Sequence, residues 1–330
     1  MLIPKTVIRQ DIKQTWMILV GLFIVPILGF PVSAYLRIER LNRSSGASIE
    51  TYASHIEGVL RARGYSFWMI LFVILLAAFF LGLERRNGFH DLSMTFPYKR
   101  STLFLSKWVL GTGALAFSYI GSFLVAYAMF LSHGYEESIA AADPWPTFLA
   151  TLIGLIGIFT FSLFVGTITG NIYSQLLLSV GCLYFPAGIF SLVRDFLYVH
   201  GAENLPSTPY WLGTLTMPWY VTNFMNPPLL SYSWIPLLVT LFSLIMGVRL
   251  YEKSPNEYNG EFLLFPRLYP AIQTGVILGA GLITGVFLER VLGTGSFSLL
   301  FYWTGFLLGG ISAYLLIKIP SKDKKSSTAV

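Results

Sequence analysis

Eight long apolar runs, each almost free of charge, constrain the fold of this chain more than any other feature of the sequence. The hydrocarbon core of a bilayer is about 30 Å thick, so a helix needs about 20 apolar residues to cross it. A helix also satisfies its backbone hydrogen bonds within one segment, as lipid requires. We therefore predict an all-α integral membrane protein, a polytopic bundle of about eight transmembrane helices. The predicted spans are 16–36, 65–83, 108–131, 148–170, 174–193, 234–250, 271–288 and 296–317.

The composition excludes a water-soluble globular protein. Hydrophobic residues make up 55% of the chain and charged residues 12%, with a mean hydropathy of +0.66. Soluble domains carry about 25% charged residues.

The first apolar run is too long, and too poor in a small-residue cleavage site, for a cleaved signal peptide, so we predict a permanent anchor. The lone Cys182 excludes an internal disulfide and a cysteine-based metal cluster.

The distribution of lysine and arginine predicts that both termini are cytoplasmic, because these residues are retained in the cytoplasm during membrane insertion. Most of the 22 lysines and arginines fall in segments on the same side as the N-terminus. The largest group on the other side lies between the first two spans and consists of Arg37, Arg40, Arg43, Arg61 and Arg63. The net charge of +6 thus reflects membrane topology, and no nucleic-acid partner is expected.

Residues 1–14 combine basic and apolar side chains in a pattern suited to a helix that lies flat on the anionic inner leaflet. The apolar members are Leu2, Ile3, Val7, Ile8 and Ile12, and the basic members are Lys5, Arg9 and Lys13. We predict an amphipathic elbow helix that bends into the first span. The alternative is a frayed polar tail ahead of that span.

Two segments between spans are predicted to form helices on the outer surface. In the first, apolar residues recur near helical spacing at Ile49, Tyr52, Ile56 and Leu60. The second, 199–233, is apolar and aromatic but is interrupted by prolines, so it is predicted to form short re-entrant or surface helices. Its tryptophans and tyrosines suit the headgroup region. The alternative for this segment is a lid over a translocation path.

Several kinds of active site are missing from the sequence. No G-x-x-x-x-G-K-[ST] loop occurs, so the chain itself is not expected to hydrolyse ATP. The histidines are scattered without metal-ligand spacing, so we expect no enzymatic activity, no metal and no cofactor bound to this chain. No charged residue lies near the middle of a predicted span, which disfavours an ion-coupled carrier.

The segment 84–107, between the second and third spans, combines dense charge with a short helical pattern. Asn87 can cap a helix, and Pro97 ends it. One face of this helix carries an apolar stripe, formed by Phe89, Leu92 and Phe96. The stripe either docks into a groove of a partner protein or inserts into the inner leaflet while the flanking basic residues meet lipid phosphates.

This arrangement resembles the membrane subunit of ABC-2-type transporters. The resemblance rests on the N-terminal elbow, on Glu84 closing the second span, and on Pro97-Tyr98-Lys99-Arg100 followed by Lys107 at the start of the third. In that family the helix between spans two and three is the coupling helix, which contacts a separate ATPase subunit. The resemblance implies a coupling helix at about 87–97. The implied coupling residues are Glu84, Asn87, Phe89, Asp91, Leu92, Phe96, Pro97 and Arg100.

The resemblance also implies a division of the chain into parts. These are an elbow helix at 1–14, a six-span core at 15–250, a cytoplasmic linker with two extra transmembrane helices at 251–318, and a basic cytoplasmic tail at 319–330. The extension beyond six spans is similar to that of the longer permeases of bacilli. These permeases are encoded in an operon that responds to cell-envelope antibiotics and was once linked to acetoin use.

A permease subunit in a bacterial cell membrane is the function that the resemblance implies. It would export a lipid, an antibiotic or another cell-envelope compound, with ATP and Mg bound by partner ATPase subunits. A second permease subunit, identical or different, would complete the pathway, and membrane lipids would surround both. The alternative is a membrane sensory or scaffold protein of an envelope-stress complex that transports nothing.

Overall fold

A computed structural model describes residues 5–43, 49–61, 64–86, 98–202, 205–222, 231–254, 260–293 and 297–318. Within them the structure is helical, and an isolated bridge between Thr169 and Leu263 is the one β-type pairing. The helices are α1 (Lys5–Ile27), η1 (Leu28–Val32), α2 (Ser33–Arg43), α3 (Ile49–Leu60), α4 (Ser66–Ala78), η2 (Phe79–Leu83), α5 (Glu84–Arg86), α7 (Arg100–Ser132), α8 (Glu136–Ala142), α9 (Trp145–Ile168), α10 (Ile172–Val199), α11 (Tyr210–Leu215), α12 (Trp219–Thr222), α13 (Trp234–Glu252), η4 (Pro266–Leu268), α14 (Tyr269–Leu292) and α15 (Ser298–Lys318).

The prediction of eight spans is confirmed, since eight helices in the described part of the chain are long and apolar enough to cross a membrane. The predicted surface helix after the first span is also present, as α3. The elbow predicted for 1–14 is not a separate helix in the structure. Its described part belongs to α1, which continues from Lys5 to Ile27 without interruption. No proline or glycine stands near the predicted boundary to end a helix there.

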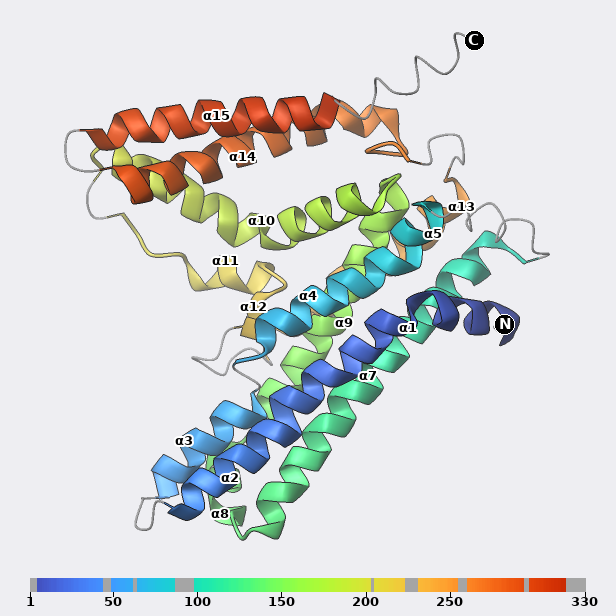
Figure 1. The fold of residues 1–330 in the computed structure, drawn as a ribbon, viewed down its shortest axis with the longest axis vertical. Helices are drawn as coiled ribbons and strands as arrows, with labels where there is room; N and C mark the ends of the chain where they lie inside the picture. The colour runs from blue at the N-terminus through green and yellow to red at the C-terminus, as the bar shows by residue number, and fades with distance from the viewer. Residues whose placement is uncertain are drawn as a thin grey trace.

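Two unusually long helices give the molecule its elongated shape (Figure 1). The first is continuous from α1 through α2, because the π-helical turn η1 accommodates Pro31 without ending the helix. The second is α7, whose 33 residues extend for about 50 Å at about 1.5 Å per residue. Both exceed the thickness of a hydrocarbon core of about 30 Å. Their far ends pack with α3 and α8 into a small bundle that we call the distal bundle.

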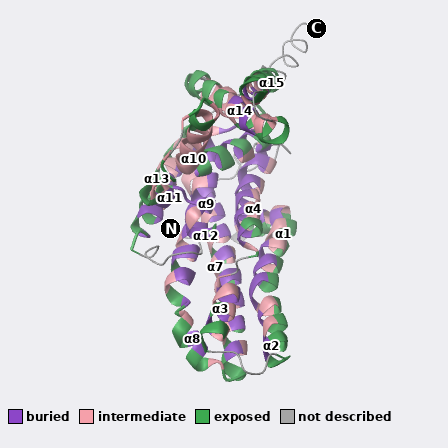
Figure 2. Cartoon of the chain, turned by 90° about the vertical axis from the view of Figure 1, so that its left-hand side faces the viewer, coloured by how far each residue is buried: buried purple, intermediate pink, exposed green. Residues whose placement is uncertain are grey.

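The spans α4 and α9 form the centre of the molecule and are the most buried of the eight (Figure 2). Aromatic residues fill the contacts around them. Phe80 meets Phe159 edge to face with ring centroids 6.2 Å apart, and Phe123 stacks on Phe148 at 4.1 Å. Aromatic pairs at these separations add to the stability that their buried area already provides.

The segment predicted to form re-entrant or surface helices contains α11 and α12. α11 packs against α10 and α13, and α12 packs against α9. Glycines of α9 make room for this contact. A Cβ atom at Gly154 would lie 2.8 Å from the Cβ of Tyr220, and one at Gly157 would lie 2.8 Å from the Cε of Met217. The segment thus forms the short helices α11 and α12 in place of one long helix, as its prolines predict.

Replacing Tyr220 by Phe is expected to lower the free energy of unfolding by about 1 kcal/mol. Tyr220 is buried, and its hydroxyl oxygen lies 3.0 Å from the carbonyl oxygens of both Thr214 and Tyr232. Thermal unfolding in detergent measures the effect, with Tyr198→Phe as the control because Tyr198 is 70% exposed. Equal stability of the two variants would contradict a structural role for the Tyr220 hydroxyl.

The last two spans, α14 and α15, form a pair that contacts the other spans mainly through α10. Gly281 and Gly285 face α15, where a Cβ atom would lie 3.0 Å from the carbonyl oxygens of Phe306 and Tyr302 respectively. The Thr284 hydroxyl donates a hydrogen bond to the Gly305 carbonyl at 2.8 Å. Small residues and interhelical hydrogen bonds of this kind are typical of helix packing in lipid.

Candidate functional site

A buried charged cluster joins three helices at the predicted cytoplasmic end of the bundle. The Nζ of Lys107, the eighth residue of α7, lies 2.6 Å from Oδ1 of Asp11 on α1 and 3.1 Å from Oε2 of Glu84 on α5. The Lys107 side chain is 2% exposed, and the two carboxylates are 4% and 2% exposed. Charges buried this deeply require partners, because removal from water costs several kcal/mol per ion. The cluster therefore fixes the starts of α1 and α7 against the end of the second span.

Arg85, the residue next to Glu84, anchors the same corner to α9. Its Nη1 donates hydrogen bonds to the carbonyl oxygen of Gly166, at 2.5 Å, and to that of Thr169. These carbonyls belong to the C-terminal end of α9, where helix carbonyls lack intrahelical partners and the helix dipole attracts a cation. Burial lowers the pKa of the Arg85 guanidinium, while the nearby Tyr251 and Glu84 act in the opposite direction. The guanidinium group of arginine stays protonated in proteins, so Arg85 is a cation that donates to both carbonyls.

The turn between α9 and α10 that Arg85 contacts is also bound by the linker after α13. The Gly260 amide donates to the Gly170 carbonyl at 2.9 Å, and the Leu264 amide donates to the Ile168 carbonyl at 2.8 Å. Asn171 caps α10 by accepting a hydrogen bond from the Ser174 amide at 2.8 Å. The segment after α13 is therefore attached to the α9–α10 turn at the site where Arg85 binds.

Arg100, the first residue of α7, binds the end of α13. Its Nη1 donates to the Ser254 carbonyl at 2.9 Å and approaches the Glu252 carbonyl at 3.4 Å. Tyr251, on the last turn of α13, is fully buried with its ring 5.6 Å from that of Phe104 on α7. The start of α7 is thus attached to α13 by a side-chain hydrogen bond and by aromatic packing.

The predicted coupling residues divide into two groups. Glu84 and Arg100 lie in the network just described, on either side of the segment 87–97. The others lie outside the described residues, and these are Asn87, Phe89, Asp91, Leu92, Phe96 and Pro97. Sequence reasoning missed Asp11, Arg85 and Tyr251 as members of the site and gave Lys107 only as a family feature. The sequence contains one signal for Asp11. It is the sole acidic residue before Glu39, and its neighbours Lys5, Arg9 and Lys13 are basic.

The charged cluster lies toward the ends of its helices. Lys107 is about 10 Å along α7 from Arg100 at about 1.5 Å per residue. No charged residue lies near the middle of a predicted span, and the placement of this cluster agrees with that pattern. The sequence pattern does not indicate that charges near span ends are buried with one another. Among the described residues, no group of three or more histidine, cysteine, aspartate or glutamate side chains could hold a metal ion.

Replacing Gly82 by Ala is expected to destabilise the protein by about 1–3 kcal/mol, because a Cβ atom there would lie 2.7 Å from the Ile172 Cα. The neighbouring atom is backbone, so η2 would have to move away from α10 and carry Glu84 and Arg85 with it. The control is Gly113→Ala on α7, where a Cβ atom meets nothing within 4 Å. Thermal unfolding compares the two, and a Gly82 variant as stable as the Gly113 variant would contradict the tight contact.

Comparison with known proteins adds an independent observation to this geometry. The chain is 31% identical to "Probable ABC transporter permease YtrC" of Bacillus subtilis over 229 residues, which are 63% of this chain and 67% of that relative. It is 24% identical to "Probable ABC transporter permease YtrD" of the same organism over 223 residues, 64% of this chain and 65% of that relative. No protein-family model matches the sequence.

Proposed function

Because this chain belongs to the family of ABC transporter permeases, we propose that it is the membrane subunit through which a separate ATPase chain drives transport. The ATP and Mg would bind to that partner, since no phosphate-binding loop occurs in this sequence. The permease subunit itself is not catalytic. Its part in the cycle is to change conformation when the partner does.

The observation that carries the proposal is that the described residues on both sides of 87–97 are attached to neighbouring helices. On one side, Glu84 pairs with Lys107 and Arg85 binds the carbonyls that end α9. On the other side, Arg100 binds the end of α13. A force applied to 87–97 would therefore reach α1, α7, α9 and α13 through these side-chain contacts.

The proposed sequence of events follows from these attachments. The helix predicted at 87–97, with its stripe of Phe89, Leu92 and Phe96, would sit in a groove of the ATPase subunit. Closure of two ATPase subunits around ATP would displace the stripe, and the anchored residues would tilt the attached spans. Since packed interfaces shift between discrete arrangements, a small displacement at this site can open a path elsewhere in the bundle.

The substrate and the second subunit are the finer parts of the proposal. We expect export of a lipid, an antibiotic or another cell-envelope compound across the bacterial cell membrane, with both termini of the chain in the cytoplasm. A second permease subunit, of the same or a different sequence, would face this one. The exposed apolar side chains of α13 support such a contact, and they include Leu237, Leu238, Leu241, Phe242 and Ile245.

Replacing Phe89 or Leu92 by Ala is expected to abolish the response of the partner ATPase to the permease, because the apolar stripe loses an anchor side chain. The experiment purifies the tagged chain from its native host and measures the ATPase activity of the subunit that copurifies. The control is Phe67→Ala, since Phe67 is 63% exposed at the opposite end of the second span. A chain that copurifies with no ATPase, or whose Phe89 and Leu92 variants match the control, would favour the membrane scaffold over the permease.

A further inference from the structure

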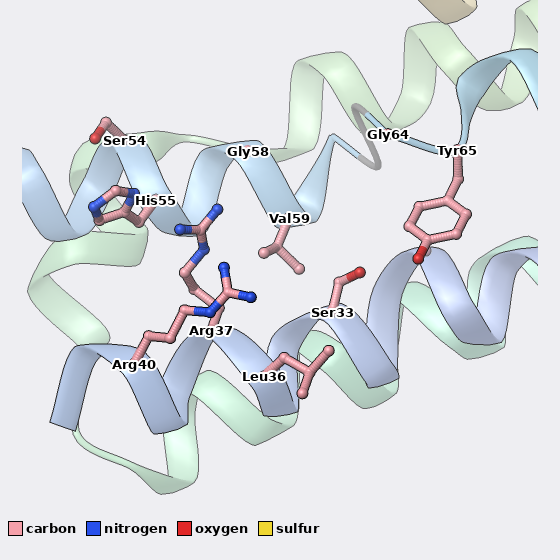
Figure 3. Close-up of a pocket in the computed structure, with 11 residues that line it drawn as sticks. Ser33, Leu36, Arg37, Arg40, Ser54, His55, Gly58, Val59, Gly64 and Tyr65 are labelled. Carbon is pink, nitrogen blue, oxygen red and sulfur yellow. The ribbon is translucent and has the colours of Figure 1, made fainter. Parts of the chain in front are cut away.

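A second candidate site lies in the distal bundle, far from the charged cluster. A cavity of about 470 Å³ separates α2 from α3 and extends to Tyr65 at the start of the second span (Figure 3). Arg37 in this cavity is about 39 Å from Asp11 along the continuous first helix, at about 1.5 Å per residue. This separation exceeds a hydrocarbon core of about 30 Å, so we expect the cavity at the level of the opposite headgroups or beyond them.

Positive charge dominates the lining of the cavity. Arg37 and Arg40 extend from α2 into the space between the helices, and His55 faces this space from α3 (Figure 3). None of the 11 residues that line the cavity is acidic. Neither arginine forms an ion pair with a described residue. Two guanidinium groups in one cavity repel each other, and a bound anion would remove this repulsion.

The neighbouring arginines show that an acidic partner is available in this bundle when the fold uses one. Arg43 pairs with Glu39 at 2.5 Å, and Arg61 pairs with Glu57 at 2.6 Å. Arg37 and Arg40 differ from them because their charge is directed into a cavity. Arg37 and Arg40 also belong to the group of arginines in the predicted outer segment between the first two spans. Such a group is unexpected there, since arginine and lysine are enriched in cytoplasmic segments.

The wall opposite the arginines leaves room for a ligand. Gly58 and Gly64 both border the cavity, and a Cβ atom at either would meet no other atom within 4 Å. A side chain at either position would therefore project into open space. Tyr65 and Ser33 border the cavity at the end nearer the spans.

We propose that this cavity binds a phosphate group. The planar guanidinium groups of Arg37 and Arg40 present several N–H donors in a geometry that matches phosphate oxygens, and His55 can donate a further hydrogen bond. The phosphate could be carried by a lipid whose headgroup lies in the adjacent leaflet or by a soluble compound outside the membrane. The proposal concerns the end of the molecule opposite the coupling segment and does not depend on the ATPase partner.

The test measures phosphate binding by the purified full-length chain in two arms. In the first, inorganic pyrophosphate is titrated into the chain in detergent. In the second, the chain is placed in nanodiscs of phosphatidylcholine that contain phosphatidic acid, and native mass spectrometry after release counts the phosphatidic acid that stays bound. Binding in the first arm identifies a soluble ligand, and binding in the second alone identifies a lipid headgroup.

The variants that carry the test are Arg37→Gln with Arg40→Gln, each singly and together, and Gly58→Phe, which fills the cavity without removing charge. The double variant and Gly58→Phe are expected to weaken binding at least about tenfold, since each arginine supplies a charge-assisted hydrogen bond. Arg43→Gln is the matched control, because Arg43 lies on the same helix and is already paired. Absence of binding in both arms, or an equal loss with Arg43→Gln, would overturn the proposal.

Discussion

Replacing Lys107 by Met is expected to lower the free energy of unfolding by about 3–5 kcal/mol, because it removes one partner of a buried ion cluster. Asp11 and Glu84 would remain as two carboxylates, each at most 4% exposed, without the cation between them. One carboxylate would then have to take up a proton, or the starts of α1 and α7 would have to separate so that water enters. We expect a large decrease in the midpoint of thermal unfolding in detergent and a decrease in the yield of monodisperse protein.

Two further variants separate the loss of a buried partner from a general effect of removing a lysine. Lys253→Met removes an exposed lysine near the same end of the molecule and is expected to leave stability unchanged. The triple variant Asp11→Asn, Glu84→Gln and Lys107→Met replaces the whole cluster with uncharged groups and is expected to recover most of the lost stability. If the triple variant were no more stable than Lys107→Met, uncompensated charge would not be the cause of the loss.

Replacing Arg85 by Met is expected to uncouple the ATPase from transport and to lower the free energy of unfolding by about 2–4 kcal/mol. The carbonyls of Gly166 and Thr169 would lose the buried donor that ties the end of the second span to the end of α9. The segment 87–97 would still bind the ATPase, but its movement would no longer be passed to α9. Transport in reconstituted vesicles should fall more steeply than ATP hydrolysis.

Arg249→Met is the control for this result, since Arg249 is an exposed arginine in the last turn of α13. A second variant, Arg85→Lys, keeps the charge but loses the paired geometry of the guanidinium group, so it should restore stability in part and coupling less. Equal loss of transport and ATP hydrolysis in Arg85→Met would indicate that Arg85 stabilises the fold without transmitting movement.

The sequence predicts the parts of this fold that depend on local pattern. The number and positions of the spans follow from apolar runs, and α3 is predicted at its observed position because its apolar residues repeat with the helical period. The elbow boundary could not be placed in this way. A basic amphipathic pattern indicates a surface helix, but no residue near position 14 breaks the helix, so α1 continues through the boundary.

The candidate site depends on contacts between distant parts of the chain, which local pattern does not contain. Asp11 and Lys107 are 96 residues apart, and Arg85 binds carbonyls 81 and 84 residues away. A charged residue near the end of an apolar run is compatible both with contact with water and with burial beside an opposite charge. Only the packing of α1, α5 and α7 decides between the two. The family resemblance implies a bracing role for Glu84 and Arg100, and that role stays a prediction.

Photo-crosslinking from position 89 tests the central claim most directly. A photoreactive phenylalanine analogue replaces Phe89 in the full chain, and the assembled complex is irradiated in native membranes. The account predicts a crosslink to the ATPase subunit that forms from position 89 and does not form from the same analogue at Phe67. An intact complex that crosslinks from position 89 only to lipid, or from position 67 to the ATPase, would contradict it.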